Sequence, residues 1–132
     1  MDGDILIRWF THWIKLKIKI HNHYKEFYFR DKEIWWASLG ANIGFEQNGK
    51  NESYERPVLV LRKFGKDMLW AIPLTSKNKI GPFYYDLLPI GFNSRLILSQ
   101  MRLISSKRLI RKVGIVPLTS FMEIKNKVKA LI

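Results

Sequence analysis

Two short apolar runs near the middle of the chain predict a β-hairpin. Residues 57–61 and 68–72 are rich in aliphatic, β-branched and aromatic side chains, and a basic connector with one glycine, residues 62–67, joins them. Runs of this length between turn residues are typical of buried strands. Antiparallel pairing would bring Arg56, before the first run, and Thr75, after the second, to the same end of the sheet. A cation and a hydroxyl at neighbouring strand ends suit a phosphate.

The first part of the chain has an apolar stripe at helical spacing. Its members recur every three or four residues, at Leu6, Trp9, Trp13, Leu16, Ile20, Tyr24 and Phe27. Residues 14–20 also alternate as a strand would, but the stripe is longer, so we predict a helix with a break near residues 21–23. We expect residues 1–31 to form an amphipathic extension that docks on its own domain or on a partner, rather than on a membrane surface.

Further apolar runs predict a β-rich domain over residues 32–132. Residues 33–39, 83–87 and 96–104 are expected to be strands, and the basic segment 105–115 is expected to be a strand or turn at a sheet edge. The domain is therefore expected to contain five or six short strands.

Two of these segments carry candidate ligand contacts. The predicted loop 40–55 contains three glycines and three asparagines. Polar loops of more than about 12 residues are usually functional or disordered. The loop candidates are therefore Glu46, Gln47 and Lys50. Alternation in the second half of residues 96–104 places Gln100 and Arg102 on one face of that strand.

The chain ends in a predicted helix. Ser120 and Glu123 have the spacing of a capping box, and the expected buried stripe is Phe121, Ile124, Val128 and Leu131. The tetrapeptide Pro-Leu-Thr-Ser occurs at residues 73–76 and again at 117–120. The second copy is explained as the entry to this helix. The first copy follows a strand, which leaves Thr75 as the hydroxyl that requires a functional explanation, although a threonine at a strand end is often structural.

Composition and charge indicate one cytoplasmic domain with a basic surface. A chain of 132 residues that is 47% hydrophobic can bury a core, and the absence of cysteine excludes disulfides and thiolate metal sites. No apolar run approaches the roughly 18 residues of a membrane span. The formal charge is +12, and residues 95–132 hold nine basic side chains against one acidic. Such a surface attracts nucleic-acid phosphates or an acidic protein segment, with a solvated basic face as the alternative.

The histidines give no sign of a metal site. All three, His12, His21 and His23, lie in the N-terminal extension, and the further ligands that a metal would need are not displayed. We interpret His21 and His23 as solvated loop side chains and expect no cofactor.

An ordered set of motifs resembles the MazF/PemK family of toxin endoribonucleases from bacterial toxin-antitoxin pairs. The motifs span residues 32–132 and are Glu33-Ile34-Trp35-Trp36, Gly44-Phe45-Glu46-Gln47-Asn48-Gly49, Arg56-Pro57, Ile72-Pro73-Leu74-Thr75-Ser76 and Gln100-Met101-Arg102. The segment between Gln47 and Arg56 is longer than is usual in the family, and Ser99 stands where aspartate is usual. We expect the longer loop to influence which RNA is cut.

The resemblance implies a fold, an activity and roles for individual residues. The fold would be a small, mainly β, Src-homology-3-like antiparallel barrel with a C-terminal helix, acting as a homodimer. The activity would be metal-independent cleavage of single-stranded RNA that leaves 2′,3′-cyclic phosphate and 5′-hydroxyl ends. Arg56 would stabilise the phosphorane charge, Thr75 would donate to a phosphate oxygen, and Glu46 would act as base or orient Arg56. The predicted RNA-binding residues are Phe45, Gln47, Lys50, Ser76, Lys77, Lys79, Gln100 and Arg102.

The expected protein partner is an antitoxin with an acidic and apolar tail, attracted by the basic last third of the chain. Two other functions stay open at this point. One is a catalytically silent toxin of the same fold that binds a protein such as gyrase, and the other is a basic RNA-binding module. A nuclease built on the histidines is disfavoured because all three lie outside the segment that resembles the family.

Overall fold

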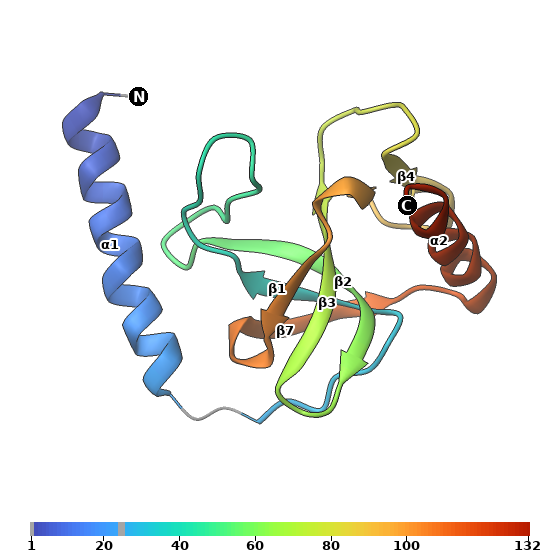
Figure 1. Cartoon of the computed structure of the whole chain (residues 1–132), viewed down its shortest axis with the longest axis horizontal. Helices are drawn as coiled ribbons and strands as arrows, with labels where there is room; N and C mark the ends of the chain where they lie inside the picture. The colour runs from blue at the N-terminus through green and yellow to red at the C-terminus, as the bar shows by residue number, and fades with distance from the viewer. Residues whose placement is uncertain (1, 24–25) are drawn as a thin grey trace.

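The computed structural model describes residues 2–23 and 26–132, and Figure 1 shows their arrangement. In chain order the helices and strands are α1 (Gly3–Asn22), β1 (Glu33–Ser38), β2 (Glu55–Phe64), β3 (Met68–Thr75), β4 (Tyr84–Asp86), β5 (Arg95–Ile97), β6 (Arg102–Ser105), β7 (Leu109–Ile115) and α2 (Leu118–Ala130). Three short 3-10 turns are η1 (Leu88–Ile90), η2 (Leu98–Gln100) and η3 (Ser106–Arg108). The predicted class is confirmed: the fold is mainly β, with one helix near each end of the chain.

The seven strands form one antiparallel sheet. Its order is β4-β5-β3-β2-β1-β7, and β6 also pairs with β3. Among the described residues the outer strands β4 and β7 do not pair with each other, so the sheet is not closed. The basic strand β7 lies at an edge of the sheet, as the sequence predicts.

The predicted hairpin is formed by β2 and β3. Its strands are longer than the apolar runs, because Arg62, Lys63 and Phe64 continue β2 and the turn begins only at Gly65. Val58 pairs with Pro73. The same antiparallel register, continued toward the open end of the hairpin, places Arg56 opposite Thr75.

The single strand predicted over residues 96–104 is wrong, because the chain turns in the middle of this segment. Leu74 of β3 pairs with Leu96 of β5, and Ala71 of β3 pairs with Arg102 of β6. Three steps along β3 therefore correspond to six steps along the partner segment, and the three extra residues form the η2 turn. Gln100 and Arg102 consequently do not share a face of one strand.

The sheet buries an apolar cluster on each face. Successive side chains of a strand point to opposite faces. Leu59 of β2 accordingly packs with Ile72 of β3 and with Phe121 of α2 in one cluster. Val60, the next residue, belongs to the second cluster together with Phe29, which precedes the predicted start of the domain at residue 32.

The start of α2 differs from the prediction. The helix begins at Leu118 with Pro117 at its N-cap position, and no side chain caps it. Ser120 is therefore buried inside the helix, and Glu123 accepts a hydrogen bond of 2.6 Å from the Tyr85 hydroxyl instead of closing a capping box. The contact of Glu123 with Tyr85 of β4 thus takes the place of the predicted contact with Ser120. The apolar stripe is correct as far as Phe121, Ile124 and Val128, whereas Leu131 is exposed.

Helix α1 docks on the long loop between β1 and β2, beside which it runs in Figure 1. Trp13 is only 6% exposed and forms a third apolar cluster with Ala41 and Tyr54. The Tyr54 hydroxyl also donates a hydrogen bond of 2.7 Å to the Trp9 carbonyl. The extension is thus attached to its own domain by a core that is separate from the two cores of the sheet.

The helical stripe ends where α1 ends, at Asn22, close to the predicted break. Tyr24, the next predicted member of the stripe, lies outside the described residues. Phe27 packs against Trp35 of β1, with ring centroids 5.3 Å apart, and so belongs to the sheet. Among the described helices, none has the length and apolar character needed to cross a membrane.

Candidate functional site

The open end of the β2–β3 hairpin lies in a cavity of about 610 Å³. The long loop, the two strand ends, the segment after β3 and the η2 turn supply its walls. Its charged lining side chains are four cations and one carboxylate, which makes the cavity electropositive. Nine of the eleven residues predicted for the site line it: Phe45, Glu46, Gln47, Lys50, Arg56, Thr75, Lys77, Lys79 and Gln100.

Arg56 is fixed in place by two backbone carbonyls. Its Nε donates to the Asn48 carbonyl at 2.7 Å, and its Nη1 donates to the Leu74 carbonyl at 3.0 Å. A guanidinium has five N–H donors, so these two bonds leave one on Nη1 and two on Nη2 to hold an anion. Burial lowers the pKa of Arg56, but a guanidinium remains a cation at neutral pH. Arg56 is therefore a preformed anion-binding group whose position depends on both the loop and β3.

Thr75 is the buried hydroxyl of the cavity, with 7% of the residue exposed. Its Oγ1 accepts a hydrogen bond of 3.2 Å from the Lys77 amide. Because the oxygen is the acceptor in that bond, the hydroxyl hydrogen can be donated to a ligand. Thr75 is thus oriented by the turn that follows β3.

The loop between β1 and β2 is folded on itself at its base. The Gly49 amide donates to the Gly40 carbonyl at 2.8 Å, and the Leu39 amide donates to the Tyr54 carbonyl at 2.9 Å. The Asn42 side chain donates to the Gln47 carbonyl at 2.8 Å. These bonds close the neck of the loop and fix the Asn48 carbonyl that holds Arg56.

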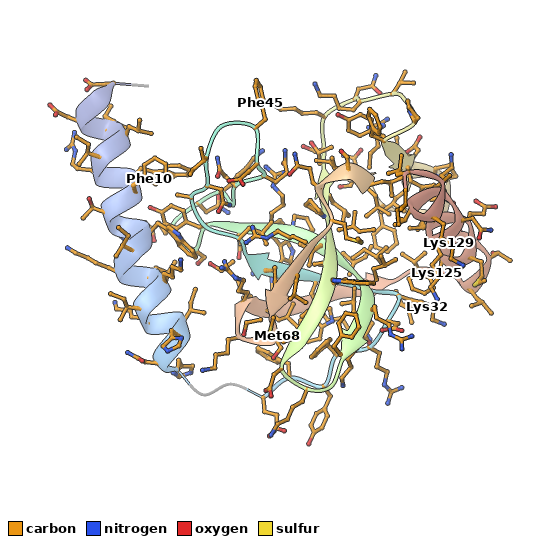
Figure 2. All side chains as sticks on the ribbon, viewed as in Figure 1. Phe10, Lys32, Phe45, Met68, Lys125 and Lys129 are labelled. Atoms are coloured by element: carbon orange, nitrogen blue, oxygen red, sulfur yellow. The ribbon has the colours of Figure 1, made fainter. Side chains whose placement is uncertain are left out.

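Gln100 ties the tip of this loop to the η2 turn. Its Nε2 donates to the Phe45 carbonyl at 3.0 Å, and its Oε1 accepts from the Gln47 amide at 3.4 Å. Phe45 itself is 97% exposed, and Figure 2 shows its ring at the tip of the loop, directed away from the protein. Gln100, predicted as a contact for RNA, therefore positions the loop in this structure.

Glu46 is the carboxylate among the lining side chains. Its Oε1 accepts a hydrogen bond of 2.9 Å from the Ile43 amide, and the residue is exposed. The described hydrogen bonds of Arg56 go to carbonyls, so the structure shows Glu46 stabilising the loop tip rather than orienting Arg56.

Two of the predicted residues lie elsewhere. Ser76 lines a neighbouring cavity of about 230 Å³, to which Arg56 also contributes. It points away from the main cavity because consecutive residues of an extended chain, here Thr75 and Ser76, point in opposite directions. Arg102 lies in β6, beyond the η2 turn, and is not part of the lining of the main cavity.

Sequence reasoning missed two side chains at the site. Trp9 of α1 lines the main cavity, although the N-terminal extension was placed outside the functional domain. Arg108 donates to the Ser38 carbonyl at 3.0 Å and lies 5.8 Å from the centre of the Trp13 ring, so it joins the start of the loop to α1. Burial, and then the nearby charge of Arg102, lower the pKa of Arg108. The helical stripe contained Trp9, but no sequence signal placed it beside Arg56.

The histidines take part in helix docking or lie on the surface. His12 Nδ1 is 3.1 Å from the Tyr54 hydroxyl, and the His21 carbonyl accepts a hydrogen bond from the Lys107 side chain. Within residues 2–23 and 26–132, no group of three or more histidine, aspartate or glutamate side chains is placed to hold a metal ion.

Comparison with known proteins matches this arrangement to one family. The model for PemK-like, MazF-like toxins of type II toxin-antitoxin systems matches residues 30–132. A MazF structure (Form-I) from Deinococcus radiodurans is 25% identical, with a TM-score of 0.62, and the match covers 80% of this chain and 97% of that chain. A MazE–MazF structure (Form-II) from the same organism is 25% identical, with a TM-score of 0.60, covering 80% and 96%.

A third structure is similar in fold. It is an endoribonuclease in complex with its cognate antitoxin from a mycobacterial species, 12% identical, with a TM-score of 0.60 and coverage of 76% of this chain and 90% of that chain. A search of curated proteins found no match to the sequence. Helix α1 lies outside the segment that the family model matches.

Proposed function

The chain belongs to the family of PemK-like, MazF-like toxins of type II toxin-antitoxin systems, and we propose that it is an endoribonuclease that cleaves single-stranded RNA. One observation carries the proposal. Arg56, anchored by two carbonyls, and the buried Thr75 line the same electropositive cavity. The family motifs in the sequence imply the same activity.

The proposed reaction needs only groups that a protein can supply. The 2′-oxygen of a ribose attacks its own phosphorus, the bond from phosphorus to the 5′-oxygen of the next nucleotide breaks, and that oxygen takes up a proton. The products are a 2′,3′-cyclic phosphate and a 5′-hydroxyl. The transition state concentrates negative charge on the phosphate oxygens, so fixed cations and N–H donors aimed at them lower the barrier.

We assign the electrostatic role to Arg56 and a hydrogen-bonding role to Thr75. The free N–H groups of Arg56 can grip two phosphate oxygens, and because both of its anchors are present before RNA binds, little reorganisation is required. Thr75 donates its hydroxyl hydrogen to a phosphate oxygen. Arg56 does not serve as the acid or base in this proposal, since its proton is too tightly held near neutral pH.

Glu46 is the side chain that we propose as acceptor of the 2′ proton. It is the carboxylate of the cavity lining, and its exposed position at the loop tip allows it to move toward a bound strand. Lys50, Lys77 and Lys79 would attract the backbone of the strand, and Phe45 would stack on a base.

We further propose that the active toxin is a homodimer and that an acidic antitoxin binds it. The MazE–MazF structures among the similar proteins support an antitoxin partner. The nine basic side chains between residues 95 and 132 provide the charge that such a partner would neutralise.

The test is incubation of the purified protein with single-stranded RNA of varied sequence in excess EDTA. We expect fragments that end in cyclic phosphate and begin with a 5′-hydroxyl, and we expect Arg56→Ala to abolish them. Arg62→Ala is the matched control, because Arg62 lies toward the other end of β2 and outside the cavity. Absence of cleavage in every sequence context, together with inhibition of gyrase, would instead establish the silent-toxin alternative.

A further inference from the structure

Helix α1 forms part of the wall of the cavity that holds Arg56, although it lies outside the segment shared with the family. Trp9 is the residue that makes this contact. The same side chain lines a second cavity, of about 510 Å³, between α1 and residues 51–54 of the loop. Trp9 therefore lies on the border between the two cavities, and a strand leaving the first would pass over it to enter the second.

Trp9 is held in place by its neighbours in α1 and by Tyr54 of the loop. Its ring centroid lies 5.4 Å from that of Tyr54 and 5.3 Å from that of Phe10. Its carbonyl accepts the Tyr54 hydroxyl at 2.7 Å, and His12 Nδ1 lies 3.1 Å from the same hydroxyl. An aromatic ring that is fixed before a ligand arrives loses little conformational entropy when a base stacks on it.

The second cavity has the chemistry of a nucleotide subsite. Its lining offers the aromatic ring of Trp9, the side chain of Asn51 for hydrogen bonds and Arg8 as a cation for the phosphates, while Tyr54, which is 2% exposed, supports Trp9 from behind. Glu52 also lines it, so the site is less electropositive than the main cavity and depends more on stacking. Base stacking on aromatic side chains is how proteins bind single-stranded RNA, whereas a duplex offers no exposed base face.

We propose that α1 extends the RNA-binding site, with Trp9 as a stacking platform for a nucleotide that leaves the main cavity and the cavity beside it as a further nucleotide subsite. This inference rests on the proposed function. It assigns to the extension a role in binding and in selecting the RNA, while the chemical step stays with Arg56 and Thr75.

The experiment measures binding and cleavage separately in the full chain. Binding is followed by fluorescence anisotropy with 2′-O-methyl RNA of mixed sequence, which lacks the attacking hydroxyl, in a short form of about four nucleotides and a long form of about ten. Wild-type protein should bind the long form more tightly. Trp9→Leu should weaken binding of the long form at least about fivefold, the low end of the effect of removing one stacking partner, and change binding of the short form little. Trp9→Phe should restore most of the loss.

Phe10→Leu is the matched control. Phe10 belongs to the same apolar cluster and contacts Trp9, but it is not part of the lining of either cavity. If Phe10→Leu weakens binding as much as Trp9→Leu does, or if Trp9→Leu has no effect, the subsite is refuted and Trp9 only packs the helix. The proposed function fails differently: wild-type protein would then cut no RNA, whether or not it binds the two forms.

Discussion

Gly40 is the position at which the docking of α1 can be tested most directly. Its φ of +83° is one that residues with a Cβ rarely adopt, and a Cβ built there would lie 2.8 Å from Cη2 of Trp13 and closer still to two other ring atoms. Gly40→Ala would therefore force the Trp13 side chain out of its place. Gly44 provides the matched control, because its φ is +57° and a Cβ there would meet nothing within 4 Å.

The two substitutions separate backbone strain from loss of packing. Left-handed backbone costs about 1–2 kcal/mol for a residue with a Cβ, and both variants carry this cost. Gly40→Ala should add about 1.5–3 kcal/mol, the contribution of burying one large apolar side chain, because Trp13 is 6% exposed in the native protein. The additional loss should be local, since Trp13 belongs to a cluster separate from the two clusters of the sheet.

Hydrogen exchange resolved along the chain is the appropriate assay. We expect Gly40→Ala to reduce protection of amides in α1 by about 10- to 150-fold, the equivalent of the lost packing energy, while amides of β2 and β3 retain most of their protection. Gly44→Ala should leave α1 protected as in the wild type. Equal protection of α1 in both variants would show that Trp13 does not hold the helix.

Three further predictions follow from individual contacts. Arg56→Lys should lower kcat at least about tenfold without unfolding the protein, because an ammonium cannot bind both anchoring carbonyls and grip a phosphate; unchanged kcat would refute the anchored-guanidinium role. Glu33→Gln should destabilise the protein by about 1–3 kcal/mol at neutral pH. Burial opposes ionisation of Glu33, but hydrogen bonds from Lys112, Trp35 and the Arg30 amide lower its pKa overall. The ionised Glu33 side chain therefore stabilises the native protein fully at pH values above its unfolded-state pKa of about 4.3, and this stabilisation is lost as the pH falls through its lower folded-state pKa. The difference between the chemical-denaturation midpoints of wild type and Glu33→Gln should accordingly disappear in acid. Antitoxin binding should weaken at high salt, as measured by calorimetry, and a salt-independent affinity would remove the electrostatic part of that proposal.

Local patterns predicted the parts of the fold that depend on neighbours in sequence. The hairpin, the edge strand and the apolar stripe of α2 each follow from periodicity that one element displays by itself. The η2 turn could not be predicted in this way, because it exists to let β5 and β6 pair with different parts of β3. The predicted capping box is absent for a related reason: the Glu123 carboxylate accepts a hydrogen bond from Tyr85 of the distant strand β4.

In the candidate site, too, some residues could be placed from a local pattern, whereas others depend on contacts between distant segments. Arg56 and Thr75 could be placed together from the register of one hairpin, and Thr75 lines the main cavity as expected. Ser76 lines the neighbouring one, since the side chains of an extended chain alternate. Trp9 reaches the site because α1 packs on the loop, with Trp13 against Gly40 and Tyr54, and these contacts join segments almost 30 residues or more apart in the sequence.

In the proposed function, the loop between β1 and β2 would connect substrate selection to the chemical step. Its Asn48 carbonyl holds Arg56, its neck is closed by Gly49 and Tyr54, and its tip is held by Gln100. A Cβ at Gly49 would overlap the Tyr54 carbonyl, so the neck cannot widen to accept a larger residue without moving that strand end. Helix α1 packs on the same neck, where Trp13 contacts Ala41 and Tyr54. The contacts of this loop therefore matter more than its length. Helix α1 packs on its neck, Gln100 of η2 holds its tip, and its Asn48 carbonyl holds Arg56.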